Sequence, residues 1–228
     1  MAARTDSPTR APHPPPAPTP GPGRPTTDGR QQRRERNREA VVDALLDLYR
    51  EGNLQPGTEE IAARSGLSPR SLFRYFDDVD DLTRTAIRHQ EDRVMHLVPV
   101  DVGPDRPLAV RVGALVDQRF RLFDAVGHAA TVARLRAPFQ PLLAEEIHQS
   151  REFLRSQIAT LFAPELAGMD RASGGAVLAA ADVLTSFESC QLLLHGQGLT
   201  PTRARAVVAG ALSALFGSPG MGPGHERA

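Results

Sequence analysis

The chain has 228 residues, enough for one or two domains with a buried core. Hydrophobic residues make up 40%, charged residues 24%, and the formal net charge is zero, values that are ordinary for a soluble protein. The single cysteine allows no internal disulfide, no apolar run approaches the roughly 18 residues of a membrane helix, and no apolar signal segment opens the chain. We therefore expect a cytoplasmic protein that does not bind membranes, and neither a disulfide scaffold nor a secreted precursor.

The neutral total conceals a basic N-terminal segment. Residues 1–38 hold eight arginines and three acids, a net charge of +5, so the rest of the chain carries −5. A basic arm beside an acidic body is typical of nucleic-acid binders, although a solvated tail without function has the same composition. Charge alone favours the tail.

Proline and glycine mark the two ends of the chain. Nine of the 20 prolines lie between Pro8 and Pro25, and large apolar side chains are scarce there. Such a segment cannot offset the entropy cost of ordering, so we predict that residues 1–30 are disordered. The Gly/Pro-rich residues 218–228 are predicted to be a flexible tail.

The first part of the body is predicted to hold four helices. Apolar residues spaced three and four apart indicate an amphipathic helix over residues 33–51. Thr58 can cap a short helix that stops at Gly66, and Ser68-Pro69 supplies the cap and first position of a third helix, to about Phe76. An acidic cluster over residues 77–81 opens a fourth helix, to about Leu97.

The prolines at 99 and 104 mark a boundary, and five further helices are predicted beyond it. They are expected at residues 107–126, 128–136, 139–162, 173–195 and 200–216. No alternating β-branched run is bounded by turn signals, so we predict an all-α protein.

Residues 57–76, GTEEIAARSGLSPRSLFRYF, are predicted to form two short helices joined by a tight turn. Gly66 can take the positive φ of the turn, and Ala62 leaves room where the helices cross. The alternative is a plain αα-hairpin inside a bundle, but the cap, the proline and the Arg-aromatic pattern of the third helix favour a DNA-binding helix-turn-helix.

The third predicted helix is short enough to enter a major groove. Arg70 could read a guanine edge, while Thr58, Ser68 and Tyr75 could bind phosphates. The basic arm could contact phosphates or the minor groove. The candidate DNA-binding residues are Arg33, Arg34, Arg36, Arg38, Thr58, Ser68, Pro69, Arg70, Ser71, Phe73, Arg74 and Tyr75.

With IAARSGLSPRSLFRYF as its most specific part, the stretch over residues 34–94 resembles the TetR family of transcriptional regulators. The resemblance implies a helix-turn-helix DNA-binding domain, here residues 31–98, and a helical effector-binding and dimerisation domain, here residues 105–217. The family often has Tyr where Phe73 stands and Lys where Val79 stands. Tyr75 is the candidate replacement for the hydroxyl missing at Phe73. Val79 cannot donate to a phosphate, so we expect weaker anchoring to the DNA backbone there, for which the basic arm could compensate.

The second domain offers two sets of candidate residues, and for each the alternative is an ordinary place in the core. An effector pocket would draw on Phe120, Phe123, His128, Arg134, Phe139, His148 and Phe153. Because TetR-like proteins are typically homodimers, a dimer interface would draw on stripes of the last two predicted helices, namely Ala176, Ala180, Val183, Phe187, Val208, Ala211, Leu212 and Leu215. His128 and His148 lack partners at metal-ligand spacing, so neither a metal nor a cofactor is predicted.

Enzyme motifs are not found: there is no phosphate-binding loop, nucleophile elbow, zinc-protease motif or dinucleotide-binding glycine pattern. Cys190 falls on a predicted buried helix without a recognisable base, which favours an inert role. We therefore predict a regulator of transcription, a repressor that binds double-stranded operator DNA as a homodimer and is released by a small-molecule effector. A helical protein-interaction module and, less favoured, a helical enzyme acting on small molecules remain as alternatives.

Overall fold

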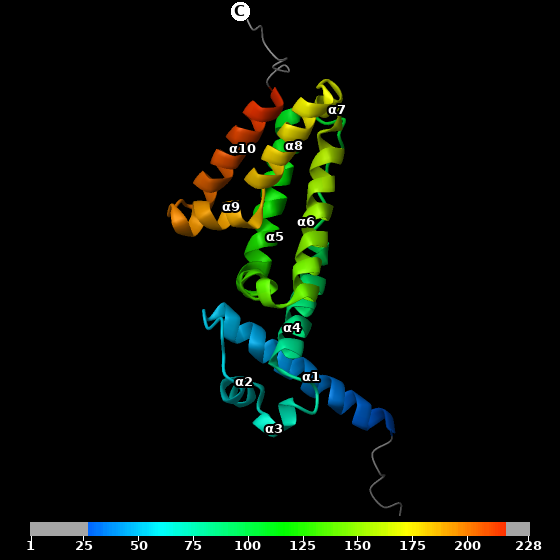
Figure 1. Cartoon of the computed structure of the whole chain (residues 1–228), viewed down its shortest axis with the longest axis vertical. Coiled ribbons are helices and arrows are strands. Elements are labelled where there is room, and N and C mark those ends of the chain that lie inside the picture. The colour runs from blue at the N-terminus through cyan, green and yellow to red at the C-terminus, as the bar shows by residue number, and fades with distance from the viewer. Residues whose placement is uncertain (1–26, 218–228) are drawn as a thin grey trace, which may run out of the picture. The chain divides into compact units, whose positions relative to one another are not determined.

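A computed structural model describes residues 27–217, and every regular element in this range is a helix or helical turn (Figure 1). This confirms the all-α prediction for the described part. Predictions for residues 1–26 and 218–228 lie outside it. The chain divides into a first unit, residues 1–37, and a second unit, residues 38–228.

Helix α1, Thr27–Arg50, begins six residues before the predicted start at residue 33. Residues 27–30 are therefore helical, and the prediction of disorder was wrong for them. Long unbranched side chains such as Gln31, Gln32 and Arg33 favour helix, so a helix nucleated further along the chain propagates back through them.

The N-terminal helices of the second unit, residues 38–94, form what we call the head. It comprises the second part of α1, then α2 at Thr58–Ser65, α3 at Pro69–Leu72 and α4 at Val79–Val94. Its core contains fully buried apolar side chains from α1, α2, α3 and α4, among them Val41, Leu45, Tyr49, Ile61, Leu72 and Ala86.

The C-terminal domain is a bundle built on α5, Leu108–Arg136, which runs through its middle (Figure 1). The other elements are α6 (Pro141–Leu161), α7 (Ala163–Ala167), α8 (Arg171–Leu184), α9 (Phe187–Gln191), a π-helical turn (Leu192–Gly196) and α10 (Pro201–Gly217). Short 3-10 turns at Met95–Leu97 and Ala137–Phe139 follow α4 and α5. The core of the bundle is centred on Leu115, Ile158, Phe162 and Leu212.

In the C-terminal domain, two predictions divide the chain into helices differently from the structure. The helices predicted at 107–126 and 128–136 are one element, bent at Gly127, where φ is 14° and ψ is −99°. The single helix predicted at 173–195 is instead interrupted after α8, where the Ser186 hydroxyl accepts a hydrogen bond from Ser189 N at 3.2 Å and caps α9. Serine occurs both inside helices and as a helix cap, so the hydrophobic periodicity could not distinguish one continuous helix from two helices with a cap at Ser186.

The part of α5 that follows the bend at Gly127 packs against the head. Ala129 and Val132 belong to the core of the head, and Arg136 pairs with Asp80 of α4 at 2.6 Å. Just before the bend, the Ala125 carbonyl accepts a hydrogen bond from Gln90 of α4 at 2.8 Å. The bundle and the head therefore share packed side chains as well as the chain connection.

Within residues 27–217, no single helix has both the length and the apolar character needed to cross a membrane; by length and composition only, α8 taken together with Phe187–Gly196 forms one bent pair that passes.

Candidate nucleic-acid interface and internal cavity

The turn between α2 and α3 has the geometry that its sequence predicts. Gly66 ends α2 with φ at 70°, and the next amide, Leu67 N, donates to the Ala62 carbonyl at 3.1 Å. Left-handed backbone of this kind is strained for residues other than glycine. Ala62 is buried, as expected for the close crossing of the two helices.

The start of α3 is fixed by Ser68 and Pro69. The Ser68 hydroxyl accepts from Ser71 N at 3.3 Å and lies 2.9 Å from the Ser71 hydroxyl, while Pro69 occupies the first turn. Beyond Leu72 the chain continues in tight turns, with Tyr75 N donating to the Leu72 carbonyl at 2.9 Å. The regular helix is therefore shorter than predicted. The hydroxyls of Ser68 and Ser71 take part in this local hydrogen bonding, and both side chains remain exposed or partly exposed.

Arg70, Phe73 and Arg74 lie on the outside of α3 and the turn after it. All three are exposed, Phe73 by 53% despite its size. Among the described residues, neither arginine pairs with a carboxylate. Tyr75 is partly buried against the core of the head, and Thr58 is half-buried at the start of α2. Arg70 and Arg74 are therefore the cations that α3 presents to a partner.

Thr58 does not cap α2, so that prediction was wrong. Gly57 occupies the cap position, and the Glu60 carboxylate accepts a hydrogen bond from Gly57 N at 2.7 Å. Thr58 is the first residue of the helix, where its hydroxyl makes no capping bond.

The four candidate arginines of α1 fall into two groups. Arg33, Arg34 and Arg36 are exposed in the first unit. Arg38 belongs to the second unit, where its guanidinium lies 5.2 Å from the centre of the Phe76 ring and Nη2 lies 3.5 Å from the Thr85 hydroxyl. Arg38 thus contributes to packing within the head, a role that its sequence position did not reveal.

The acidic cluster at residues 77–81 is used by local structure. Asp78 caps α4 by accepting from Asp81 N at 2.7 Å, and Asp80 pairs with Arg136. Asp81 lies 3.9 Å from Arg84. These contacts offset negative charge that would otherwise oppose a phosphate beside α3.

The C-terminal domain contains a cavity of about 740 Å³ bounded by α4, α5, α6 and the α8–α9 corner. Of the predicted pocket residues, Phe123, Arg134 and Phe153 line it. The other four do not. Phe120 is in the core with the Arg205 guanidinium 5.0 Å from its ring, and Phe139 is 85% exposed. His128 and His148 are exposed at the surface, so aromatic and histidine content was a poor guide to the cavity.

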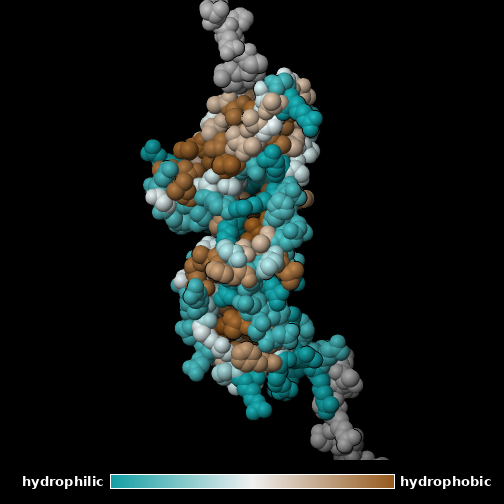
Figure 2. Space-filling model, viewed as in Figure 1, coloured by the Kyte–Doolittle hydropathy of each residue, from teal (hydrophilic) through white to brown (hydrophobic). Residues whose placement is uncertain are grey.

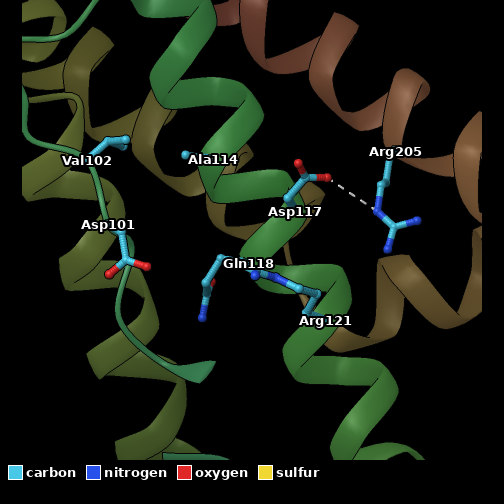
Figure 3. Close-up of a pocket in the computed structure, with 7 residues that line it drawn as sticks. All are labelled: Asp101, Val102, Ala114, Asp117, Gln118, Arg121 and Arg205. Carbon is cyan, nitrogen blue, oxygen red and sulfur yellow. Dashed lines mark ion pairs between the residues drawn. The ribbon is translucent and has the colours of Figure 1, made fainter. Parts of the chain in front are cut away.

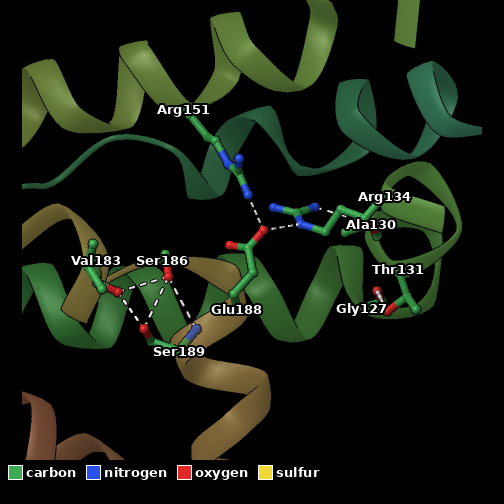
Figure 4. Close-up of polar contacts among 9 residues, drawn as sticks. All are labelled: Gly127, Ala130, Thr131, Arg134, Arg151, Val183, Ser186, Glu188 and Ser189. Carbon is green, nitrogen blue, oxygen red and sulfur yellow. Dashed lines mark hydrogen bonds and ion pairs between the residues drawn. The ribbon is translucent and has the colours of Figure 1, made fainter. Parts of the chain in front are cut away.

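Charged residues that the sequence analysis did not select also line this cavity. Glu188 of α9 accepts from Arg134 Nε at 2.7 Å and from Arg151 Nη2, joining three helices across one wall (Figure 4). The Arg134 guanidinium lies 4.2 Å from the centre of the Phe187 ring. Burial raises the pKa of Glu188, but the hydrogen bond from Arg134 and the nearby charges outweigh it, so this pKa is lowered and the carboxylate is ionised.

Arg119 of α5 is the buried cation of the cavity, with 1% of its surface exposed. It stands in the apolar stripe formed by Val112, Leu115, Val116, Leu122 and Phe123. The sequence could have identified Arg119, because an arginine at a core-facing position of an amphipathic helix is unusual and needs hydrogen-bond partners.

A second, smaller pocket of about 410 Å³ lies between α5, α10 and the segment before α5 (Figure 3). Asp117 and Arg205 pair across it at 3.4 Å, and Gln118 uses its amide to donate to the carbonyls of Leu97 and Val98. Most of the polar side chains in this pocket are therefore already engaged in contacts within the chain.

Some of the residues predicted for the dimer interface are buried within the chain, and others are exposed. Phe187, Val208 and Leu212 are buried in the core of their own chain, so placing them at an interface was wrong. Hydrophobic surface gathers over α9 and α10 (Figure 2). The exposed or partly exposed members of the predicted set are Ala176, Ala180, Val183, Ala211 and Leu215.

Chemistry of other kinds has little support among the described residues. No group of three or more His, Cys, Asp or Glu side chains in residues 27–217 is arranged to hold a metal ion. Burial raises the pKa of the Cys190 thiol to about 12, so it is not a reactive thiolate at neutral pH.

No family model and no curated protein sequence matches the chain. Solved structures do match. A TetR-family transcriptional regulator from Streptomyces coelicolor superposes with a TM-score of 0.64 and 18% identity over 79% of this chain and 80% of the other. The chain has the TetR fold.

Two further solved structures support this assignment of the fold. A transcriptional regulator from Rhodococcus sp. Rha1 matches with a TM-score of 0.58 and 18% identity, over 79% of this chain and 96% of that one. The multidrug binding protein EbrR, solved with imidazole, matches with a TM-score of 0.52 and 20% identity, over 83% of this chain and 97% of its own. In the TetR fold, as here, a helix-turn-helix head precedes a helical C-terminal domain.

Proposed function

We propose that the protein is a sequence-specific DNA-binding regulator of transcription. The observation that carries the proposal is the outer face of α3 and the turn after it, where Arg70, Phe73 and Arg74 are exposed and neither arginine pairs with a carboxylate of residues 27–217. Exposed arginine and aromatic side chains on a rigid, capped element suit a partner surface that is anionic and carries apolar groups. The TetR fold makes duplex DNA the best candidate for that partner.

Each residue of this face has a role that follows from its chemistry. Arg70, near the start of α3, has the reach and donor geometry for O6 and N7 of a guanine in the major groove. Phe73 cannot donate to a phosphate, and its exposed ring suits the methyl group of a thymine. Ser68, Ser71, Arg74, Thr58 and Tyr75 are proposed to hold phosphates, with Pro69 packed beside the backbone.

The arginines of the first unit are proposed to strengthen this binding without reading sequence. Arg33, Arg34 and Arg36 are exposed on the opening turns of α1. Arginines of this kind favour phosphates or a narrow minor groove. Arg38 would contribute chiefly by holding Phe76 and, through it, the head.

We further propose that the protein acts as a homodimer through α8 and α10. Val183 is 63% exposed and Val207 50%, and small residues such as Ala176 and Ala180 would let partner helices approach closely. A single short α3 supplies few base contacts, whereas two heads about 34–36 Å apart would meet successive major grooves. Sedimentation velocity of the free protein tests the dimer.

An effector in the cavity could control DNA binding through α5, as expected of a repressor that a small molecule releases. After the bend, Ala129 and Val132 pack into the head while Ala130, Ala133 and Arg134 line the cavity, where Ala129 also takes part. A ligand that favours a different position of this segment would also favour a different position of the head. A 100-fold loss of operator affinity needs about 2.7 kcal/mol of differential binding between the two states.

A competition binding assay tests the central proposal. The protein is titrated at physiological salt against labelled duplex DNA from upstream of its own gene, with unlabelled specific and random duplexes as competitors. We expect specific competition, and Arg70→Ala is expected to lower specific affinity by about 1–3 kcal/mol. Arg121→Ala, an exposed arginine of α5, is the matched control and should have no effect.

Two outcomes would change the proposal. An equal loss on all DNA sequences would make Arg70 a phosphate contact. No preference for any upstream duplex would favour the alternative that the head binds another protein.

A further inference from the structure

The cavity of the C-terminal domain contains a buried positive charge that the chain does not balance locally. Arg119 donates to the Leu154 carbonyl at 2.8 Å, to Gln157 Oε1 at 2.9 Å and to the amide oxygen of Gln118. All three acceptors are neutral. Within residues 27–217, no carboxylate forms an ion pair with this guanidinium.

Two of the three carboxylates that line the cavity are already paired with other arginines. Glu188 is shared by Arg134 and Arg151, which leaves one positive charge in excess in that group. Asp182 attracts Arg119 through space, but its own carboxylate lies 3.5 Å from Arg155. Glu91 is the remaining acid of the wall; burial raises its pKa, and the negative charge of nearby Glu146 raises it further. Three arginines and three acids line the cavity, and among them Arg119 and Glu91 are the two that form no ion pair within residues 27–217.

Burial also lowers the pKa of Arg119, but only to about 10, so the guanidinium stays charged at neutral pH. A buried charge of this kind is costly unless a counter-ion completes its shell. In this apolar stripe the charge of Arg119 has hydrogen-bond partners but no compensating carboxylate, which is what a bound anion would supply.

Most of the remaining wall is apolar. Side chains of Ile87, Val94, Leu122, Phe123, Val126 and Phe187 face the same space. A volume of about 740 Å³ falls in the range of pockets that hold ligands of drug size.

We propose that this cavity binds an amphipathic organic anion, with its carboxylate or similar group on Arg119 and its apolar part among the aliphatic and aromatic side chains. The inference rests on the proposed function, since it names the class of effector that the regulator would sense. Glu188 is already held by two arginines, so a cationic ligand would have to use Glu91, and the decylammonium probe below tests that alternative.

Calorimetric titration of the full chain in the absence of DNA tests the inference with three probes of equal chain length: decanoate, decan-1-ol and decylammonium. We expect decanoate to bind at least about tenfold more tightly than either of the others, since only it can pair with the buried guanidinium. Equal affinity for decanoate and decan-1-ol, or tighter binding of decylammonium, would overturn the proposal.

A variant pair assigns the effect to Arg119. Arg119→Met keeps a long side chain and removes the charge, and we expect it to weaken decanoate binding about tenfold or more while leaving decan-1-ol unchanged. Arg121→Met, two residues away and exposed, is the matched control. Unchanged decanoate binding in Arg119→Met contradicts the assignment, and if that variant fails to fold, the probe series on the unmodified chain still decides. Because no DNA is present, failure here is separate from failure of the DNA-binding proposal.

Discussion

At the scale of single residues, the C-terminal domain is held at one end by a buried ion pair. Arg111 of α5 donates from Nη1 to Glu165 Oε2 at 2.7 Å and from Nη2 to Oε1 of the same carboxylate, and Nη1 also bonds the Leu161 carbonyl. Its guanidinium lies 5.4 Å from the centre of the Phe162 ring. The pair joins α5 to α7, a helix so short that its packing depends on such contacts.

Glu165→Gln should therefore destabilise the protein. It leaves Arg111, which is 4% exposed, without its counter-ion, and removal of one member of a buried pair costs about 3 kcal/mol. Urea unfolding at neutral pH measures the loss. A change within the error of the measurement would mean that Arg111 is satisfied by backbone carbonyls alone, that of Leu161 and that of Arg106, which accepts from Arg111 Nε at 2.7 Å.

The same pair predicts a dependence of stability on pH. The hydrogen bonds from Arg111 hold the pKa of Glu165 below its ordinary value of 4.5. A lowered native pKa contributes stability that is complete above the unfolded value and is lost as the pH falls through the native one. The difference in unfolding free energy between the unmodified protein and Glu165→Gln should thus be constant near neutrality and shrink below about pH 4.5. A difference that grows on acidification would contradict the assignment.

At the scale of elements, the α2–α3 turn is the feature that local sequence predicts best. Gly66, Ser68 and Pro69 act through their own backbones and nearest neighbours, so their roles as turn, cap and first helical residue are the same in the sequence and in the structure. The break after α8 and the cavity were not predictable in this way. Whether Ser186 caps a new helix, or Arg119 faces a cavity, depends on elements distant in sequence.

Gly66→Ala tests the turn. Nothing lies within 4 Å of an added Cβ, so the expected loss comes only from the left-handed backbone, about 1 kcal/mol. Gly113→Ala is the matched control: it lies inside α5 with equally open space, and alanine should stabilise that helix by about 0.5–1 kcal/mol. Thermal or urea unfolding of the two variants should therefore give shifts of opposite sign, and a stabilised Gly66→Ala would refute the role of the positive φ.

At the scale of the whole molecule, a chain with no net charge has to attract a polyanion by the placement of its cations. Of the acids after α3, Asp78 caps α4 while Asp80 and Asp81 lie near Arg136 and Arg84, whereas Arg70 and Arg74 have no acidic partner in the described part of the chain. The arginines at the start of α1 are further exposed cations, in the first unit. Affinity for DNA should thus depend on salt far more strongly than the net charge suggests.

The salt dependence separates a DNA-binding arm from an inert tail. Every arginine that no longer neutralises a phosphate should make the slope of log K against log salt concentration less negative by about 0.9, so the triple variant Arg33→Ala, Arg34→Ala, Arg36→Ala should shift it by up to about 2.7. The control removes the same charge from exposed positions of the C-terminal domain, by Arg106→Ala, Arg121→Ala and Arg171→Ala. Fluorescence anisotropy at several salt concentrations measures both slopes. Because the two variants have equal net charge, only direct binding of phosphates by the arm predicts a difference between them, and equal slopes would identify the segment as a solvated tail.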